Sequence, residues 1–203
     1  MKPRRRRKSS SEQDARVVEA IVVPRYAAHF ARLFLPRVSS DARMVLDVGC
    51  GTGHVSFHVL ARLGSMSRVI AIDTDEGLVD IARRRGWDEI GKRLFFKVES
   101  ADALSFGDGV FDAVVGNLLL PELEHPTKAL AEMRRALVPG GELFLTTPLR
   151  GTFVEALDML REIAVHDEDN ALASRVEAAA RQDPDPESLE TDLRDAGYED
   201  VTV

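Results

Sequence analysis

The stretch Met-Val-Leu-Asp-Val-Gly-Cys-Gly-Thr-Gly, residues 44–53, predicts a buried strand that runs into a glycine-rich turn. Gly49, Gly51 and Gly53 can adopt positive φ angles at little steric cost, and they leave no Cβ between the backbone and a ligand. A helical pattern follows directly, and a helix N-terminus presents unpaired N–H groups with a partial positive charge. The sequence therefore places a candidate ligand site at this turn.

Strand-like and helix-like segments alternate along the chain after this turn. Apolar runs predict strands over residues 44–48, 68–73, 94–99, 111–117 and 142–148. Helical patterns cover residues 55–63, 76–85 and 126–137, and Pro139-Gly140-Gly141 predicts a sharp stop after the last of them. Most of these strands are apolar along much of their length, so we expect a doubly wound α/β domain with a mostly parallel sheet and helices on both faces.

The segments on either side of this alternation are predicted to be helical. Apolar residues spaced by three and four over residues 15–38 predict one helix, broken near Pro24 and ended near Pro36. After Pro148, helices are predicted over residues 152–165, 171–181 and 187–196, and residues 200–203 read as a short strand. We expect the N-terminal helix and the segment after the fifth strand to form a lid.

Composition indicates a soluble globular protein of 203 residues, with one domain expected over residues 15–203. No apolar run approaches the roughly 20 residues that a membrane span needs. The single cysteine, Cys50, excludes an intramolecular disulfide framework and a multi-cysteine metal cluster, and it is typical of a reducing compartment. We therefore expect a cytoplasmic protein.

The charge is unevenly distributed along the chain. The net charge is −7, and the six Lys and Arg residues within residues 2–8 contribute +6, which leaves −13 on the remainder. We expect residues 1–14 to be a disordered basic tail, with salt-sensitive contacts to nucleic acid or anionic lipid as the alternative role. The acidic body argues against nucleic acid as a partner of the domain itself.

Polar side chains are predicted at the ends of four strands, where an open parallel sheet binds its ligands. They are Asp47, Asp73, Asp102 and Asn117. Asp73 lies 20 residues after Gly53, about where a ribose-binding carboxylate is expected.

Two roles remain open for each of two of these carboxylates. Asp73 is also positioned to cap the following helix, although Thr74 or Asp75 suits that role better. Asp102 is either an acceptor for an adenine amino group or a simple loop residue.

The glycine spacing distinguishes between nucleoside ligands. Dinucleotide sites use Gly-x-Gly-x-x-Gly against a pyrophosphate, whereas this turn reads Gly-x-Gly-x-Gly beside Asp47. A carboxylate there would repel a pyrophosphate and suits a ligand with an ammonium group and a sulfonium. The pattern favours S-adenosylmethionine and disfavours a nucleotide-dependent oxidoreductase.

Five motifs in order resemble those of class I S-adenosylmethionine-dependent methyltransferases, most of all the small-molecule group that includes the ubiquinone and menaquinone biosynthesis C-methyltransferases. They are Val45-Leu-Asp-Val-Gly-Cys-Gly-Thr-Gly53, Val69-Ile-Ala-Ile-Asp73, Ala101-Asp-Ala103, Phe111-Asp-Ala-Val-Val-Gly-Asn117 and Leu137-Val-Pro-Gly-Gly-Glu-Leu143. The resemblance covers residues 15–148 and returns weakly over residues 193–201.

The resemblance implies a site and a fold. The glycines would line the methionine part of the cofactor, with Asp47 near its amino group, directly or through water. Asp73 would hold the ribose, Asp102 the adenine amine, and Asn117 with Leu118 the region beside the sulfonium. The cofactor-binding set is Asp47, Gly49, Cys50, Gly51, Gly53, Asp73, Thr74, Ala101, Asp102, Ala103, Asn117 and Leu118.

The family fold implied is a Rossmann-like sheet of seven strands in the order 3-2-1-4-5-7-6. The chain ends near where the sixth strand would run, so we expect an incomplete C-terminal edge, from a longer protein or completed in some other way. An exposed edge makes a homodimer an expected partner state.

The acceptor chemistry is less defined by the sequence. Methyl transfer needs alignment and exclusion of water, so no catalytic base is obligatory. His125 and Tyr26 are candidates, with a helix-cap role before Pro126 and core packing as the respective alternatives. His54 and His58 are spaced four apart without a third ligand, so we expect no metal site.

Two functions remain after these considerations. Gly116-Asn-Leu-Leu-Leu-Pro121 suggests an apolar mouth, hence methyl transfer to a small, apolar acceptor. The alternative is a non-catalytic S-adenosylmethionine-binding or interaction module. Cys50 is interpreted as a small packing residue, because no histidine and acid pattern accompanies it as it would a nucleophile.

Overall fold

The computed structural model describes residues 11–86, 88–181 and 183–203. The chain divides into two compact units, Met1–Thr146 and Thr147–Val203, each described by itself below. The sequence predicts one domain over residues 15–203, and the division at Thr146 separates its sheet from its last three helices.

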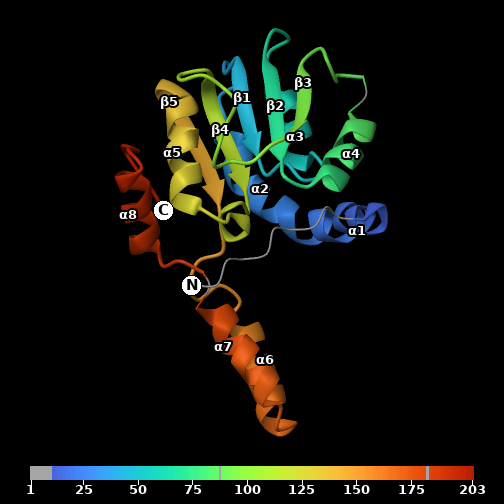
Figure 1. The fold of residues 1–203 in the computed structure, drawn as a ribbon, viewed down its shortest axis with the longest axis vertical. Helices are drawn as coiled ribbons and strands as arrows, with labels where there is room; N and C mark the ends of the chain where they lie inside the picture. The colour runs from blue at the N-terminus through green and yellow to red at the C-terminus, as the bar shows by residue number, and fades with distance from the viewer. Residues whose placement is uncertain (1–10, 87, 182) are drawn as a thin grey trace. The chain divides into compact units, whose positions relative to one another are not determined.

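The first unit contains a parallel sheet of five strands (Figure 1). The strands are β1 (Met44–Val48), β2 (Arg68–Asp73), β3 (Leu94–Val98), β4 (Phe111–Asn117) and β5 (Leu137–Thr146), in the order β3-β2-β1-β4-β5. All four pairings are parallel, which confirms the predicted α/β fold and the order of its first five strands. The strand predicted over residues 200–203 is wrong, because these residues form no regular structure.

The helix predicted to stop before Pro139-Gly140-Gly141 does so, at Ala136, but the predicted start of the fifth strand at residue 142 is wrong. Residues 139–141 lie inside β5, which begins at Leu137 directly after the preceding helix. Phe111 pairs with Leu137 and Ala113 with Glu142, so residues 138–141 oppose the single residue Asp112. A bulge absorbs the extra residues, and Gly140 accommodates it with a φ of 75°.

Helices cover the sheet on both sides, with α5 in front of it and α3 behind it in Figure 1. They are α3 (His54–Arg62), α4 (Glu76–Arg85) and α5 (Pro126–Ala136). Val45, Val69 and Ala71 pack in one apolar cluster with residues of α3 and α4. Alternate strand residues such as Leu46 and Ile72 are equally buried, as a sheet covered on both faces requires.

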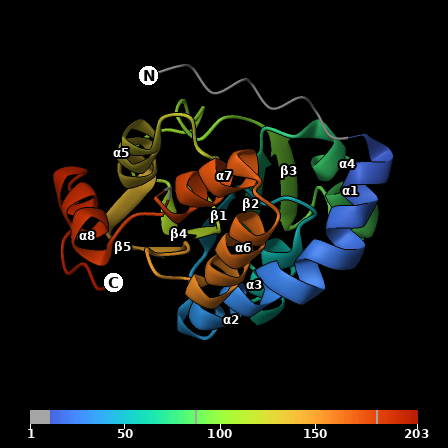
Figure 2. The same cartoon turned by 90° about the horizontal axis from the view of Figure 1, so that it is seen from below.

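The N-terminal region is one continuous helical segment, visible in blue in Figure 2. It comprises α1 (Glu12–Val17), a π-helix η1 (Val18–Ala27), α2 (Ala28–Phe34) and a 3-10 turn η2 (Leu35–Arg37). The predicted break near Pro24 is wrong, because the wider π-helical winding accommodates this proline. The predicted end near Pro36 is confirmed.

The boundary predicted at residue 15 falls inside a helix. Ser11 and Asp14 form a capping box, and α1 begins at Glu12. Of the predicted disordered tail, residues 1–10 lie outside the described residues.

The second unit contains α6 (Val154–His166), α7 (Asn170–Ala180) and α8 (Pro186–Asp195). α6 and α7 lie side by side (Figure 1) and are joined by an ion pair of 2.8 Å between Arg161 and Glu177. The predicted role of this segment as a lid stays a prediction. None of the helices in the described part of the chain is long and apolar enough to cross a membrane.

We predict that Leu46→Ala lowers the free energy of unfolding by about 2–5 kcal/mol, because it opens a cavity in the middle of β1. Leu46 is fully buried, whereas Leu33 on α2 is 67% exposed and provides a matched control. Leu33→Ala should change the free energy of unfolding by less than about 1 kcal/mol in the same urea titration. Equal losses in the two variants would contradict the placement of the core.

Candidate functional site

The glycine turn between β1 and α3 has three residues in the left-handed region. The φ angles of Gly49, Gly51 and Gly53 are 72°, 53° and 84°. A Cβ on Gly49 would lie 2.8 Å from Leu119, and one on Gly53 would lie 2.9 Å from Phe57. A Cβ on Gly51 would meet nothing within 4 Å. Two of the glycines are therefore required by close packing, and the third faces open space that a ligand can approach.

Asp73, at the end of β2, holds this turn. Its Oδ2 accepts a hydrogen bond of 2.8 Å from the Gly51 N–H, and its Oδ1 accepts one of 2.9 Å from the Asp75 N–H. The N–H groups of Gly49 and Cys50 donate to the Ile72 carbonyl at 2.8 and 3.0 Å. Three successive N–H groups of the turn are thus fixed by the end of the neighbouring strand.

The cap of α4 is Asp75, whose carboxylate accepts hydrogen bonds from the N–H groups of Gly77 and Leu78. This is the assignment that the sequence favoured over Asp73. Thr74 between them is exposed. Asp73 consequently serves the turn, and its binding of a ribose stays a prediction.

Asp47 lies inside the protein, with only 1% of its surface exposed. Its Oδ2 accepts a hydrogen bond of 2.5 Å from the Ser56 hydroxyl on α3. Burial raises the pKa of Asp47 to about 7, with the nearby charge of Asp73 acting in the same direction and the Ser56 hydrogen bond opposing it. Its predicted place near a ligand amino group stays a prediction.

Cys50 is buried at 6% exposure. Burial raises the pKa of its thiol well above the usual value, and the charges of Asp47 and Asp73 act in the same direction. The thiolate is the nucleophilic form, so this environment suppresses reactivity. The structure supports the interpretation of Cys50 as a packing residue.

The loop after β3 starts beside Asp73, because the Glu99 N–H donates to the Asp73 carbonyl at 3.0 Å. Asp102 accepts a hydrogen bond of 2.5 Å from the Ser100 hydroxyl and is half-buried. Of its neighbours, Ala101 is buried and Ala103 is exposed. This loop follows the strand next to β2 in the sheet, as an adenine site beside a ribose site would require.

Asn117 is the last residue of β4, and Leu118 follows it with a strained backbone. Leu118 has a φ of 57°, which is rare for a branched side chain. Its N–H donates both to the Thr146 carbonyl at 2.9 Å and to the Thr146 hydroxyl at 3.0 Å. The same hydroxyl donates to Asn117 Oδ1 at 2.8 Å, and Asn117 Nδ2 donates to the Ala27 carbonyl of η1 at 3.0 Å.

Leu119 brings this strand end to the glycine turn. Its side chain lies 2.8 Å from the point that a Cβ on Gly49 would occupy, and 2.9 Å from the corresponding point on Gly116. The turn after β1, the end of β2 and the end of β4 therefore form one connected surface, at the carboxyl edge that the sequence predicted.

The two candidate catalytic residues differ in their surroundings. Tyr26 is half-buried on η1, with its ring centroid 5.0 Å from that of Phe30. His125 is exposed and occupies the N-cap position of α5, where its carbonyl accepts from the Ala129 N–H and its side chain makes no capping hydrogen bond. A catalytic role for either residue stays a prediction.

His54 and His58 lie on α3 with ring centroids 4.3 Å apart. Burial, together with the neighbouring His58, Arg85 and Arg32, lowers the pKa of His54 to about 4. His54 is therefore neutral at pH 7. Within residues 11–86, 88–181 and 183–203, no group of three or more His, Cys, Asp or Glu side chains is placed to hold a metal ion.

Three contacts around Thr52 were not predicted from the sequence. Thr52 is 1% exposed, and its hydroxyl donates to the Glu19 carboxylate on η1. Arg85 on α4 pairs with Glu19 at 2.8 Å and donates to the Thr52 carbonyl at 2.9 Å. A buried threonine hydroxyl needs a hydrogen-bond acceptor, so Thr52 between two glycines was a usable signal. The sequence does not reveal the acceptor, because Glu19 lies 33 residues earlier.

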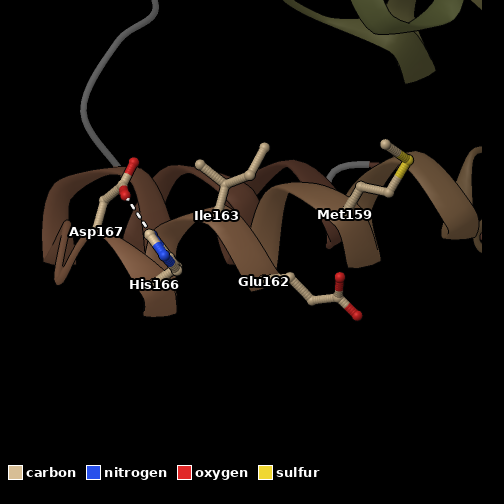
Figure 3. Close-up of a pocket in the computed structure, with 5 residues that line it drawn as sticks. All are labelled: Met159, Glu162, Ile163, His166 and Asp167. Atoms are coloured by element: carbon tan, nitrogen blue, oxygen red, sulfur yellow. Dashed lines mark hydrogen bonds and ion pairs between the residues drawn. The ribbon is translucent and has the colours of Figure 1, made fainter.

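The second unit has an open surface depression of about 290 Å³ on α6, drawn in Figure 3. Met159, Glu162, Ile163, His166 and Asp167 line it, and the His166 Nδ1 lies 2.7 Å from an Asp167 carboxylate oxygen. All five residues come from one helix and its C-terminal cap. The depression lacks the converging groups from several elements that a small-molecule site uses.

The raised pKa of Asp47 predicts how stability depends on pH. Between its ordinary pKa of 3.8 and about 7, the folded protein holds a proton that the unfolded chain has released. The contribution of Asp47 to the free energy of unfolding is therefore largest below about pH 4 and is lost as the pH rises through 7. The slope of this loss is up to about 1.4 kcal/mol per pH unit. Asp47→Asn should gain stability relative to the parent from about pH 5 to about pH 8.

Urea titrations across this range measure the difference. Asp41→Asn, at an exposed position before β1, is the control and should follow the parent. If the free energy of unfolding changed with pH in the same way in the parent and in Asp47→Asn, the assignment of a buried Asp47 that holds a proton would be contradicted.

Comparison with known proteins bears directly on this site. Residues 45–141, from the second residue of β1 to the bulge of β5, match the family described as methyltransferase domain. The chain is 32% identical over 164 residues to a ubiquinone/menaquinone biosynthesis C-methyltransferase of Chromobacterium violaceum, covering 76% of this chain and 66% of that protein. It is 41% identical over 112 residues to a ubiquinone biosynthesis O-methyltransferase of Xanthomonas oryzae, covering 55% and 45%.

Solved structures share the fold. An S-adenosylmethionine-dependent methyltransferase from Aquifex aeolicus superimposes with a TM-score of 0.66 at 16% identity, covering 94% of this chain and 90% of that one. A [4+2]-cyclase superimposes with the same TM-score, 0.66, at 26% identity, covering 86% and 58%.

The chain spans just under two thirds of the C-methyltransferase from Chromobacterium violaceum and less than half of the O-methyltransferase from Xanthomonas oryzae. The matched residues contain the glycine turn, Asp73, the loop with Asp102 and the end of β4. These comparisons identify a methyltransferase domain over residues 45–141, which is just under half of the chain.

Proposed function

We propose that the chain binds S-adenosylmethionine at the glycine turn and transfers its methyl group to a small, apolar acceptor. The observation that carries this proposal is the turn at Gly51, which faces open space while Asp73 fixes its N–H. The match to the methyltransferase domain and the similarity to named methyltransferases support methyl transfer over the alternative of a non-catalytic binding module.

The residues around the turn fit the proposed cofactor. A methionine moiety needs backbone that it can approach closely, and Gly51 offers it without a side chain in the way. A carboxylate has about four lone-pair sites, and Asp73, which accepts from the Gly51 and Asp75 N–H groups at the turn, is the proposed acceptor for the ribose hydroxyls. Asp102 and the alanines beside it would contact the adenine, and Asn117 with Leu118 would lie beside the sulfonium.

Asp47 fits a cationic ligand group through its charge rather than through direct contact. Its carboxylate is buried and accepts a hydrogen bond from Ser56, so its effect on a ligand at the turn would be electrostatic. A nearby ammonium group would favour the charged form of Asp47 and lower its pKa from about 7. We therefore expect cofactor binding near pH 7 to release a proton.

The chemistry asked of the protein is positioning. S-adenosylmethionine supplies, when bound, a methyl group activated by its sulfonium. The chain's residues orient the acceptor and exclude water, which is worth as much as ~7–11 kcal/mol in well-aligned reactions. Tyr26, half-buried on η1 near the end of β4, and His125 are the side chains proposed for moving an acceptor proton where one is needed.

The proposed acceptor class is a small molecule with an apolar ring. Leu118, Leu119 and Leu120 follow β4 at the sulfonium side of the proposed site, and all three are at least half-buried. The relatives from Chromobacterium violaceum and Xanthomonas oryzae are named for ubiquinone and menaquinone biosynthesis. Phenol and hydroquinone rings with short apolar tails are therefore the first acceptors to assay.

We also propose a cytoplasmic location and a homodimer. The one cysteine is a buried thiol, which is compatible with a reducing compartment. β3 and β5 end the sheet of the first unit, and an edge strand is a natural site of pairing with a second copy. Light scattering of the purified protein measures whether the copies associate.

The cofactor site is tested by a matched pair of glycine variants. Gly51 and Gly140 both have positive φ, at 53° and 75°, and a Cβ on either meets nothing within 4 Å. Alanine should therefore cost each of them about 1–2 kcal/mol of stability through backbone strain. Only Gly51→Ala should also lose the rise in Tm caused by S-adenosylmethionine or its demethylated product, because only there does the methyl group enter the proposed site.

Equal ligand-induced shifts in the two variants would place the cofactor elsewhere. No shift in the parent protein with either nucleoside would refute the proposed cofactor.

Turnover separates catalysis from binding alone. We predict that the parent protein converts S-adenosylmethionine to S-adenosylhomocysteine in the presence of a phenol or hydroquinone acceptor, measured by mass spectrometry of both products. Cofactor binding without product from the acceptor panel would favour a non-catalytic module. Acceptor rearrangement without consumption of the cofactor would favour chemistry of the kind named for the [4+2]-cyclase.

A further inference from the structure

We infer that Glu19 is a positioning residue that, together with Asp73, holds the glycine turn in its ligand-binding shape. The inference rests on the proposed cofactor site and adds a residue that lies before the matched family domain, which begins at residue 45. Glu19 belongs to the π-helix η1, and its side chain is 28% exposed.

The carboxylate of Glu19 makes two contacts at the turn. One oxygen accepts a hydrogen bond from the Thr52 hydroxyl, and the other lies 2.8 Å from the Arg85 guanidinium. Arg85 in turn donates to the Thr52 carbonyl at 2.9 Å. The side chain and the carbonyl of Thr52 are therefore both held by the Glu19–Arg85 pair.

These contacts control the orientation of the peptides that face the ligand. Thr52 follows Gly51, whose N–H is bonded to Asp73, and precedes Gly53, which starts α3. Rotation of the peptide after Thr52 would break the bond from Arg85, and rotation of the peptide before Gly51 would break the bond to Asp73. Two carboxylates from different elements thus restrain neighbouring residues of one turn.

Arg85 is itself held in place by packing against Phe57 of α3. Its guanidinium carbon lies 5.0 Å from the centroid of the Phe57 ring. Phe57 occupies the space that a Cβ on Gly53 would need. The pair therefore supports the packed side of the turn and leaves the open side at Gly51 free.

The other end of η1 is fastened as well. The Ala27 carbonyl accepts a hydrogen bond of 3.0 Å from Asn117 Nδ2, and Thr146 holds the Asn117 side chain in place. η1 is consequently tied to the turn after β1 at Glu19 and to the end of β4 at Ala27. This double attachment keeps the Glu19 carboxylate over Thr52.

We predict that Glu19→Ala weakens binding of S-adenosylmethionine about tenfold, because a hydrogen bond to a charged group and an ion pair are both lost. Thr52→Val should weaken it similarly, and Thr52→Ser should restore it by returning the hydroxyl. Glu19→Gln should lie between, because its amide oxygen still accepts from Thr52. The double variant Glu19→Ala, Thr52→Val should be no weaker than the poorer single variant.

Glu12→Gln provides the matched control. Glu12 lies on α1 and pairs with Arg84 on α4 at 2.9 Å, so the variant removes an ion pair between the same two regions without touching the turn. Its Kd for S-adenosylmethionine, measured by calorimetry, should equal that of the parent. In turnover assays Glu19→Ala should raise KM for the cofactor and leave kcat within about twofold, since the reacting atoms keep their neighbours.

A readout without cofactor keeps this inference separable from the proposed function. Hydrogen exchange of the Gly51, Thr52 and Gly53 amides should be faster in Glu19→Ala than in Glu12→Gln. Should the parent bind no S-adenosylmethionine, the proposed function fails while faster exchange still supports the positioning role. The positioning role of Glu19 would be overturned if hydrogen exchange of these amides were unchanged in Glu19→Ala. It would also be overturned if the Glu19 and Glu12 variants lost equal affinity for S-adenosylmethionine.

Discussion

The hydrogen bond of 2.8 Å from the Gly51 N–H to Asp73 is the interaction on which the site depends. It joins the end of β2 to the turn after β1, two places that are 22 residues apart in the chain. The other oxygen of Asp73 accepts from the Asp75 N–H, and Asp75 caps α4. One carboxylate therefore determines both the open shape of the turn and the direction in which the next helix leaves the sheet, so changes at Asp73 alter fold and site together.

Burial separates the roles of two carboxylates that look equivalent in the sequence. Asp47 and Asp73 both lie near the carboxyl ends of apolar strands, and the sequence places both near the ligand. Asp47 is instead 1% exposed and bonded to Ser56, and its burial raises its pKa to about 7, whereas Asp73 is half-buried at the turn. A desolvated carboxylate that can exchange its proton for a nearby ammonium group would make cofactor affinity sensitive to pH near neutrality.

Local sequence predicted what local physics controls. Apolar runs located β1, β2 and β4 to the residue, because a strand buried on both faces has few polar positions. The prediction failed where a distant partner decides the conformation. The sequence predicts that the fifth strand begins at residue 142, after Pro139-Gly140-Gly141, but pairing with β4 extends β5 back through these residues as a bulge. Pro24 reads as a break, but the contacts of Glu19 and Ala27 fasten the helix on both sides of it.

The same reasoning explains why the motif identifies the methyl donor and leaves the acceptor open. In the proposed site the turn presents backbone to the ligand at Gly51, and backbone recognises the common part of a cofactor whatever the acceptor is. The proposed acceptor side is formed by Leu118, Leu119 and Leu120 beside η1, where side chains rather than backbone would define the shape. η1 is also attached to the turn through Glu19 and Thr52. A change on the acceptor side that displaces η1 would therefore alter the turn and the affinity for the cofactor. The proposed donor and acceptor sites would thus be coupled through one helical segment, although only the donor site carries a recognisable sequence motif.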